Sequence, residues 1–334
     1  MAFDIRRGTN ISHWLSQSDR RGQPRREFFG RRDVELIAGL GFDHLRIPVD
    51  EEQLWDEAAS PDEEAFGLLD SALDWCAACG LRAIVDLHIL RSHHFNIPER
   101  PLWHDAACRE RFLDCWRELS RRLAGRDAAS VACELLNEPV AEDPDDWNRV
   151  SSRAIGVLRE LEPERTIFLG SNRCNSPDAF DVLTVPPGDG RLVLAFHLYE
   201  PFGLTHHEAS WTPLAFYRGP VHYPGRTIEE ADMKGLGDAE RAVLESVNGV
   251  FDRDALAALL AKPLAARERT GLALHCGEFG CLPTVPVPDR MRWYADVISI
   301  FDEHGIAWAN WDYKGSFGIV GADREVHREL VDVL

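Results

Sequence analysis

Short apolar runs alternate with longer amphipathic stretches along the whole chain. The apolar runs have the length of buried strands, and the stretches between them have the periodicity of helices that cover a sheet. Eight runs are predicted to be strands, at residues 5–11, 44–49, 82–88, 131–138, 166–171, 192–199, 272–278 and 306–311. This alternation is typical of repeated βα units around a parallel sheet.

The amphipathic stretches predict helices at residues 33–40, 66–79, 105–123, 145–161, 252–269 and 288–304, with a last helix at 323–334. The fifth unit contains only a short helical pattern, within residues 175–185. Gly41, Gly80 and Gly305 each stand between a predicted helix and the next strand. Glycine commonly ends a helix at such a position, so these three residues support the predicted boundaries.

Eight units of this kind predict an α/β fold, a (β/α)8 TIM barrel that forms one domain over residues 1–334. The sequence has no GxGxxG after its first strand, no Walker A loop and no GxSxG elbow, which argues against an open nucleotide-binding sheet. Two connections are too long for turns: residues 89–104 after strand three and 201–250 after strand six. Both follow strands, so we expect them to form walls of an active-site cleft.

Charge and composition argue against some classes of binding partner. The chain has 37 basic and 56 acidic residues, a net charge of −19, which argues against nucleic-acid binding. No apolar run is long enough to span a bilayer, so we expect no membrane partner. The N-terminus has no apolar signal region; the expected location is cytoplasmic if that terminus is native, and extracellular if a leader was removed.

The eight cysteines lie mostly in apolar contexts, where free thiols act as small hydrophobic side chains. This weakly favours a reducing compartment. Cys76 and Cys79 have the CxxC spacing, but no second CxxC accompanies them, so we interpret them as one face of a helix rather than a metal or redox site.

Seven of the eight predicted strand ends supply a candidate site residue with a polar or aromatic side chain. A single histidine is usually a satisfied core or surface residue, and a single arginine is usually an ion-pair partner. In a barrel, however, all the strand ends on one face meet at the same open rim. The sequence therefore predicts one shared site that contains Asn10, His13, Arg46, His88, Asn137, Glu138, His197, Tyr199, Glu278 and Trp311.

Two glutamates in this set suggest the chemistry. Glu138 ends predicted strand four and Glu278 ends predicted strand seven, so both lie at the mouth of the predicted barrel. Cleavage of a glycosidic bond needs one carboxyl group that stays protonated and one that is ionised. In a retaining enzyme the two groups lie about 5–5.5 Å apart. Glu134 lies deeper in strand four, and we expect it to be buried and paired.

The motifs Arg-Ile-Pro, Asp-Leu-His, Asn-Glu-Pro, His-Leu-Tyr and Gly-Glu-Phe-Gly occur in this order, followed by Trp311. Together they resemble glycoside hydrolase family 5, the cellulase family of retaining (β/α)8 barrels, over about residues 5–315. The resemblance implies that Glu138 is the general acid/base and Glu278 the nucleophile. It also implies a supporting set: Asn137 binds a sugar hydroxyl, Arg46 and Tyr199 keep Glu278 ionised, His88 and His197 complete the cleft, and Trp311 stacks on a sugar ring.

The implied activity is hydrolysis of β-linked glucans or oligosaccharides, like that of an endo-β-1,4-glucanase, through a covalent glycosyl-enzyme intermediate and without a cofactor. A β-mannanase and an exo-acting β-glucosidase are the alternative activities. Two other classes remain open: a catalytically silent carbohydrate-binding barrel, and a metal-dependent hydrolase that uses His88, His93 and His94. The sequence does not indicate an oligomeric state.

The two long connections contain further candidates for sugar contact. His94, His206 and Trp211 are expected to contact substrate. The pairs His93-His94 and His206-His207 lack the i, i+4 spacing of helical zinc ligands, so we expect no metal there. Further expectations concern single aromatic residues: Trp14, Trp103 and Phe202 are candidates for an extended stacking platform, whereas Trp75, Trp116 and Trp293 are expected in the core.

Overall fold

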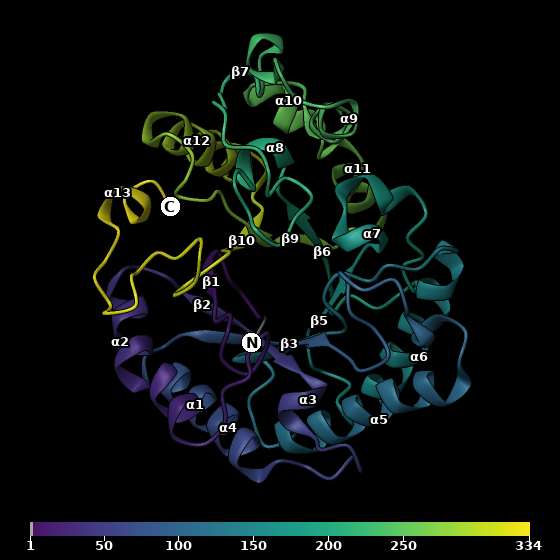
Figure 1. Ribbon diagram of the computed structural model, residues 1–334. Helices are drawn as coiled ribbons and strands as arrows, with labels where there is room; N and C mark the ends of the chain where they lie inside the picture. The colour runs from purple at the N-terminus through teal and green to yellow at the C-terminus, as the bar shows by residue number, and fades with distance from the viewer. Residues whose placement is uncertain (1–2) are drawn as a thin grey trace.

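The computed structural model describes residues 3–334 and contains a closed barrel of eight parallel strands (Figure 1). The strands are β1 (Arg7–Asn10), β2 (His44–Asp50), β3 (Arg82–Ile89), β4 (Val131–Glu134), β5 (Ile167–Gly170), β6 (Leu192–Leu198), β9 (Ala273–Phe279) and β10 (Ala307–Asn310). Each strand pairs with the next in chain order, and β10 closes the barrel on β1. The predicted (β/α)8 barrel is confirmed.

Helices surround the barrel and pack their apolar faces on it (Figure 1). In the first half these are α1 (Gln23–Phe28), α2 (Arg31–Gly39), α3 (Glu51–Leu54), α4 (Glu63–Ala78), α5 (Ala106–Leu123) and α6 (Pro144–Leu161), with the short 3₁₀ turn η1 (Pro101–Trp103). In the second half these are α7 (Asn172–Asn175), η2 (Pro177–Asp181), α10 (Arg253–Ala258), α11 (Ala261–Thr270), α12 (Val287–His304) and α13 (Arg328–Val331). Gly41, Gly80 and Gly305 all have positive φ, as expected of residues that end helices.

The barrel interior is closely packed below the strand ends. Ile84, Ala132, Phe168 and Ala195 form a small apolar cluster there. His44 and His275 lie beside it with their Nε2 atoms 3.3 Å apart. A Cβ on Gly8 would lie 2.3 Å from His44 Nε2, so only glycine fits on β1 at this point. Packed side chains therefore fill the barrel interior below the open face.

Three predicted helices differ from the structure. The helix expected at 252–269 is two helices, α10 and α11. A continuous helix is disfavoured because Pro263 has no N–H to donate to the Leu259 carbonyl and its ring would clash with that carbonyl. The helix expected within 175–185 is replaced by the four-residue α7 and the 3₁₀ turn η2. In α7, Arg173 and Cys174 have φ of 54° and 58°, so it is a left-handed turn rather than a regular helix.

The helix expected at 323–334 is also wrong, because only α13 is helical there. Val320 and Val326 form an antiparallel bridge, and the chain turns between them at Arg324 with φ of 68°. The Arg324 side chain pairs with buried Asp33 at 2.7 Å, which holds this turn against α2. The ion pair between Arg324 and Asp33 therefore stabilises a turn where the local sequence pattern predicts a helix.

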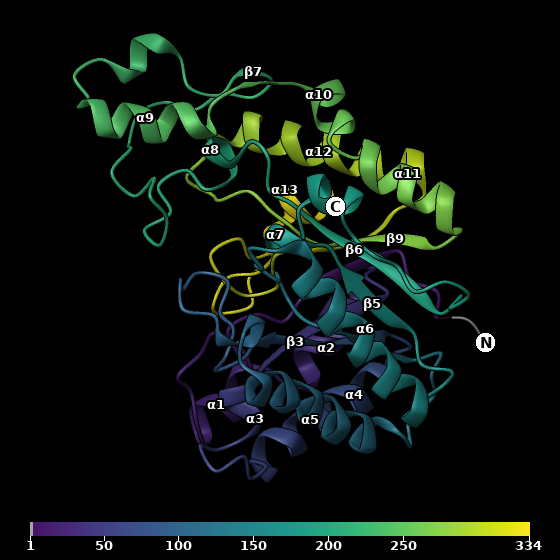
Figure 2. The same ribbon diagram turned by 90° about the vertical axis from the view of Figure 1, so that its right-hand side faces the viewer.

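The connection at 201–250 is not a plain loop. It contains α8 (Phe202–Thr205), β7 (Gly225–Arg226), η3 (Glu230–Met233), α9 (Asp238–Val247) and β8 (Val250–Phe251). β7 and β8 pair as a small antiparallel sheet, and Figure 2 shows this region projecting beyond the barrel at the upper left. Within residues 3–334, no helix has both the length and the apolar character needed to cross a membrane.

Candidate active site

A cavity of about 750 Å³ opens at the carboxyl ends of the strands. Among the residues predicted at the strand ends, its wall contains His13, His88, Glu138, His197, Tyr199, Glu278 and Trp311. Of the loop candidates, His94, His206, Trp211 and Phe202 also line it. The structure therefore brings most of the predicted site together in one cleft.

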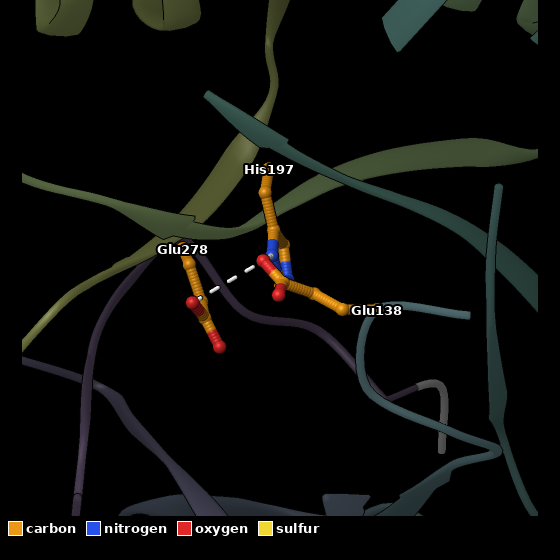
Figure 3. Close-up of side chains that lie close together, drawn as sticks. All are labelled: Glu138, His197 and Glu278. Carbon is orange, nitrogen blue, oxygen red and sulfur yellow. Dashed lines mark hydrogen bonds and ion pairs between the residues drawn. The ribbon is translucent and has the colours of Figure 1, made fainter. Parts of the chain in front are cut away.

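Glu138, His197 and Glu278 form the centre of this cleft (Figure 3). One ligand atom from each of the three side chains lies within 4.8 Å of the others. His197 and Glu278 come from the paired strands β6 and β9, whose register shifts after Phe196, so that His197 lies opposite Glu278. A Cβ on Gly277 would lie 3.3 Å from His197 Nε2, so glycine leaves room for this approach.

Arg46 connects the nucleophile candidate to strand four. Its buried guanidinium donates to Glu278 Oε1 at 2.8 Å and to both carboxylate oxygens of Glu134, at 2.7 and 3.0 Å. It also lies 3.0 Å from Asp86. The expectation that Glu134 is buried and paired is confirmed, and Glu134 with Asp86 compensates the buried charge of Arg46.

Asn10 and Asn137 lie in the layer below the cleft wall. Arg46 donates to the side-chain oxygen of each, at 2.9 Å. Asn10 also donates to the Gly277 carbonyl at 2.9 Å, which ties β1 to β9. The Asn137 Nδ2 atom is buried and has no hydrogen-bond partner among residues 3–334, so its donor is free for another group.

The surroundings of the two glutamates differ. Burial, together with the nearby Glu278 charge, raises the pKa of Glu138 well above its ordinary value. Burial also raises the pKa of Glu278, but Arg46 opposes this increase, as does the Tyr199 hydroxyl, which donates to Glu278 at 2.9 Å. Of the pair, Glu138 therefore retains a proton while Glu278 is ionised.

His197 is oriented by a residue that the sequence did not reveal. Burial lowers the pKa of His197 well below its ordinary value, so the ring is neutral. Asn175 Nδ2 donates to His197 Nε2 at 3.3 Å, which leaves the Nδ1 proton to donate to Glu138 at 2.9 Å. A Cβ on Gly170, at the end of β5, would lie 2.1 Å from Asn175 Oδ1. Strand five thus contributes to the site through Asn175, although the sequence analysis placed no site residue at its end.

His88 is held on the other side of the cleft. Its Nδ1 lies 2.6 Å from Asp86, and its ring stacks on Trp311 at 5.7 Å with an interplanar angle of 7°. Its Nε2 lies 2.9 Å from the side chain of Gln17, a second residue that the sequence analysis missed. The only sequence signal for Gln17 is its place after the predicted first strand, a few residues beyond His13.

Several loop candidates lie away from the cleft. Trp14 and Trp103 are buried and do not line the cavity, so they do not extend a stacking platform. Trp14 donates instead to the Arg25 carbonyl at 2.9 Å. His93 is also buried, and its Nε2 accepts from the Val140 backbone at 3.2 Å, just after the Asn-Glu-Pro motif. Of the three tryptophans expected in the core, Trp116 and Trp293 are fully buried and Trp75 is partly buried against it.

The histidines considered as metal ligands do not gather into one cluster in the part of the chain that the structure describes. Within residues 3–334, the cluster of close metal-ligating side chains is Glu138, His197 and Glu278. None of His88, His93 and His94 belongs to it. Arg46 already supplies a positive charge to Glu278 at 2.8 Å, so the cluster is electrostatically compensated by the protein itself.

The fold and the paired carboxylates define the class as a retaining glycoside hydrolase built on a TIM barrel. The family model for cellulase (glycosyl hydrolase family 5) matches residues 27–316. Endoglucanase C of Acetivibrio thermocellus is 31% identical, with 98% of this chain and 97% of that protein covered. Cellodextrinase A of Ruminococcus flavefaciens is 31% identical, over 91% of this chain and 84% of that protein. The chain belongs to glycoside hydrolase family 5.

Solved structures agree with this fold. The cellulose synthase subunit Z of Clostridioides difficile superposes with a TM-score of 0.80 at 22% identity, covering 99% of both chains. Thermotoga maritima Cel5A, solved with mannotriose, gives a TM-score of 0.77 at 20% identity, with 99% of this chain and 97% of that chain covered. At these identities the likeness concerns the fold alone.

Proposed function

We propose that this protein is an endo-β-1,4-glucanase that cleaves soluble β-1,4-glucans and cello-oligosaccharides with retention. One observation carries the mechanism: carboxylate oxygens of Glu138 and Glu278 lie within 4.8 Å, the close spacing that covalent attack needs and an inverting enzyme would not have. The relatives named endoglucanase and cellodextrinase support the choice of a β-glucan as substrate.

In the first step, the ionised Glu278 attacks the anomeric carbon of the sugar that lies over Trp311. The bond to the leaving oxygen breaks, and Glu138 gives its proton to that oxygen, so a neutral alcohol departs. Arg46 and Tyr199 hold Glu278 in the charged form required for attack. The product of this step is a glycosyl ester on Glu278.

In the second step, Glu138 acts as the base. It has lost its proton and now accepts one from a water molecule, whose oxygen attacks the same anomeric carbon from the opposite face. The ester bond to Glu278 breaks, and the carboxylate leaves with the bonding electrons. His197 donates to Glu138 at 2.9 Å and keeps the carboxylate in position through both steps. Two inversions give net retention.

A 2-fluoro cellobioside with an activated leaving group tests this mechanism, because the fluorine slows breakdown of the intermediate. We expect stoichiometric labelling, and peptide mapping by mass spectrometry should place the label on Glu278. A label on any other residue would overturn the assignment. A Glu278→Gln variant should remain unlabelled.

The substrate is tested separately. Cello-oligosaccharides, mixed-linkage β-glucan, β-mannan and aryl β-glucosides are compared by kcat/KM, with product lengths followed over time. We expect the highest kcat/KM on the β-1,4-glucans and early release of internal fragments. A preference for mannan would make the protein a β-mannanase, whereas release of single sugars from chain ends would make it an exo-acting β-glucosidase.

A further inference from the structure

We propose that Gln17 binds a hydroxyl group of the sugar that reacts with Glu278, and so acts as a specificity-determining residue. This inference rests on the proposed function, because it assigns a further contact within the same cleft. Gln17 lines the cavity beside His13 and His88. It lies outside every motif on which the family assignment depends.

The hydrogen bonds around His88 determine which groups Gln17 can offer. Asp86 accepts from His88 Nδ1 at 2.6 Å, so the ring proton is on Nδ1. Burial lowers the pKa of His88 to about 3, and the neutral ring leaves Nε2 as an acceptor. Gln17 Nε2 therefore donates to it at 2.9 Å. The carboxamide oxygen and the second amide hydrogen of Gln17 remain for the cleft, a pair that matches a hydroxyl group.

The backbone holds Gln17 in this position at an energetic cost. Its φ is 49°, a left-handed conformation that is unfavourable for a residue with a side chain. The buried carboxylate of Asp50 accepts from the Gln17 N–H at 2.6 Å. The Gln17 carbonyl lies 3.3 Å from Nδ1 of His13, which also has positive φ, 56°. Two left-handed residues and a buried anchor thus present adjacent side chains to one cavity.

The position of His88 identifies the sugar that Gln17 meets. His88 stacks on Trp311 and is connected to Glu278 by a chain of contacts. Asp86 accepts from His88 at 2.6 Å, and Arg46 lies 3.0 Å from Asp86 and donates to Glu278 at 2.8 Å. Glu138, by contrast, lies beside His197, whose Nδ1 is 2.9 Å from Glu138 and 3.6 Å from Glu278. The leaving sugar lies on the side of the proton donor, and the sugar that forms the ester lies against the nucleophile. Gln17 therefore contacts the sugar that becomes attached to Glu278.

The test combines a variant with modified substrates. Gln17→Met removes the hydrogen bonds and nearly keeps the volume, with Gln17→Ala as a second variant. Gln23→Met is the matched control, because Gln23 is exposed on α1 and does not line the cavity. Substrates are an aryl β-cellobioside and its analogues that lack one hydroxyl on the reacting sugar. Unfolding temperature verifies that each variant is folded.

We expect Gln17→Met to lower kcat/KM on the parent substrate by about tenfold, the usual effect of one lost hydrogen bond in a binding site. For the analogue that lacks the contacted hydroxyl, the loss should disappear, because the partner is already absent. A normal kcat/KM for both variants would overturn the proposal. An equal loss on every analogue would also overturn it, since Gln17 would then act only through His88. An inactive wild-type protein would instead contradict the proposed function.

Discussion

Glu138 has a backbone conformation that few side chains tolerate. Its φ is 47°, and such a residue typically costs about 1–3 kcal/mol. Neighbouring contacts fix this turn: the Pro139 carbonyl accepts from the Cys174 N–H at 3.2 Å, and the Val140 N–H donates to His93. In this conformation a side-chain oxygen of Glu138 lies within 4.8 Å of one of Glu278.

Removal of the proton donor should reveal its role through the leaving group. We expect Glu138→Ala to lower kcat/KM by about 10²–10⁴-fold on cello-oligosaccharides, whose leaving alcohols need a proton. On an aryl cellobioside with a strongly acidic phenol, formation of the intermediate should change far less. Burst kinetics measures that step. Glu142→Ala, an exposed residue of the same loop, serves as the control; an equal loss on both substrates would contradict the assignment of Glu138.

At the scale of single elements, the connection after β3 supports the turn after β4. His93 belongs to this connection and is buried, so its neutral imidazole accepts the Val140 N–H. Burial lowers the pKa of His93 from 6.5 to about 3. Because the pKa of His93 is lower in the folded state, the unfolded state binds a proton at His93 more readily. The stability that His93 contributes is therefore complete above pH 6.5 and is lost as the pH falls toward 3.

This dependence predicts that acid lowers the unfolding free energy of the wild type more than that of a His93→Gln variant. His93→Gln keeps an acceptor for Val140 but cannot be protonated in this range. Between pH 6.5 and about 3, the unfolding free energy of the wild type should fall more steeply, by up to about 1.4 kcal/mol per pH unit. Urea unfolding at pH 7 and pH 5 measures the difference. His104→Gln, at an exposed position, is the matched control. A His93→Gln slope equal to that of the wild type would mean that His93 is not held neutral.

The connection after β6 places an exposed aromatic ring at the cleft. Trp211 is 54% exposed, and its ring packs edge-on against His206 and Phe317. His206 in turn packs against Tyr199, whose hydroxyl donates to Glu278. A flat apolar surface at this position suits the apolar face of a sugar ring some distance from the reacting carbon.

Loss of this ring should affect long substrates more than short ones. We expect Trp211→Ala to raise KM for cello-oligosaccharides by about two- to tenfold, the value of one aromatic contact, with kcat little changed. An aryl cellobioside that is too short to reach the ring should be unaffected. Val250→Ala provides the control, because Val250 is exposed on β8 and does not line the cavity. The prediction fails if KM rises equally for short and long substrates.

At the scale of the whole molecule, the net charge of −19 acts on charged substrates at a distance. A carboxymethylated cellulose is a polyanion and should be repelled, whereas a neutral mixed-linkage β-glucan should not. Raising the ionic strength from about 0.01 M to 0.15 M shortens the screening length from about 30 Å to 8 Å. We expect kcat/KM on the polyanion to rise several-fold and that on the neutral glucan to stay constant. Equal responses would show that charge does not influence encounter with the substrate.

The sequence by itself determined the barrel and the main chemistry of the site. Strand and helix periods are local properties, so eight βα units could be counted without a structure. Because parallel strands of one barrel end at one rim, Glu138 and Glu278 could be brought together from distant positions. The motifs around them then indicated the family, which the comparison with known proteins confirmed.

Only the tertiary structure decided which other residues join this site. Asn175 reaches His197 from a left-handed turn, and Gln17 reaches His88 in the same manner. Contacts distant in sequence hold both turns: the Cys174 N–H donates to the Pro139 carbonyl, and the Gln17 N–H donates to Asp50. His93, Trp14 and Trp103 are aromatic residues of the connections, as Trp211 is, and the sequence does not distinguish them from it. In the structure they are buried, whereas Trp211 is exposed, because the paths of the connections depend on packing. Periodicity records which face of an element is buried, but it does not record where an irregular connection turns. For that reason the reaction could be predicted from the sequence, whereas the shape of the cleft around the sugar could not.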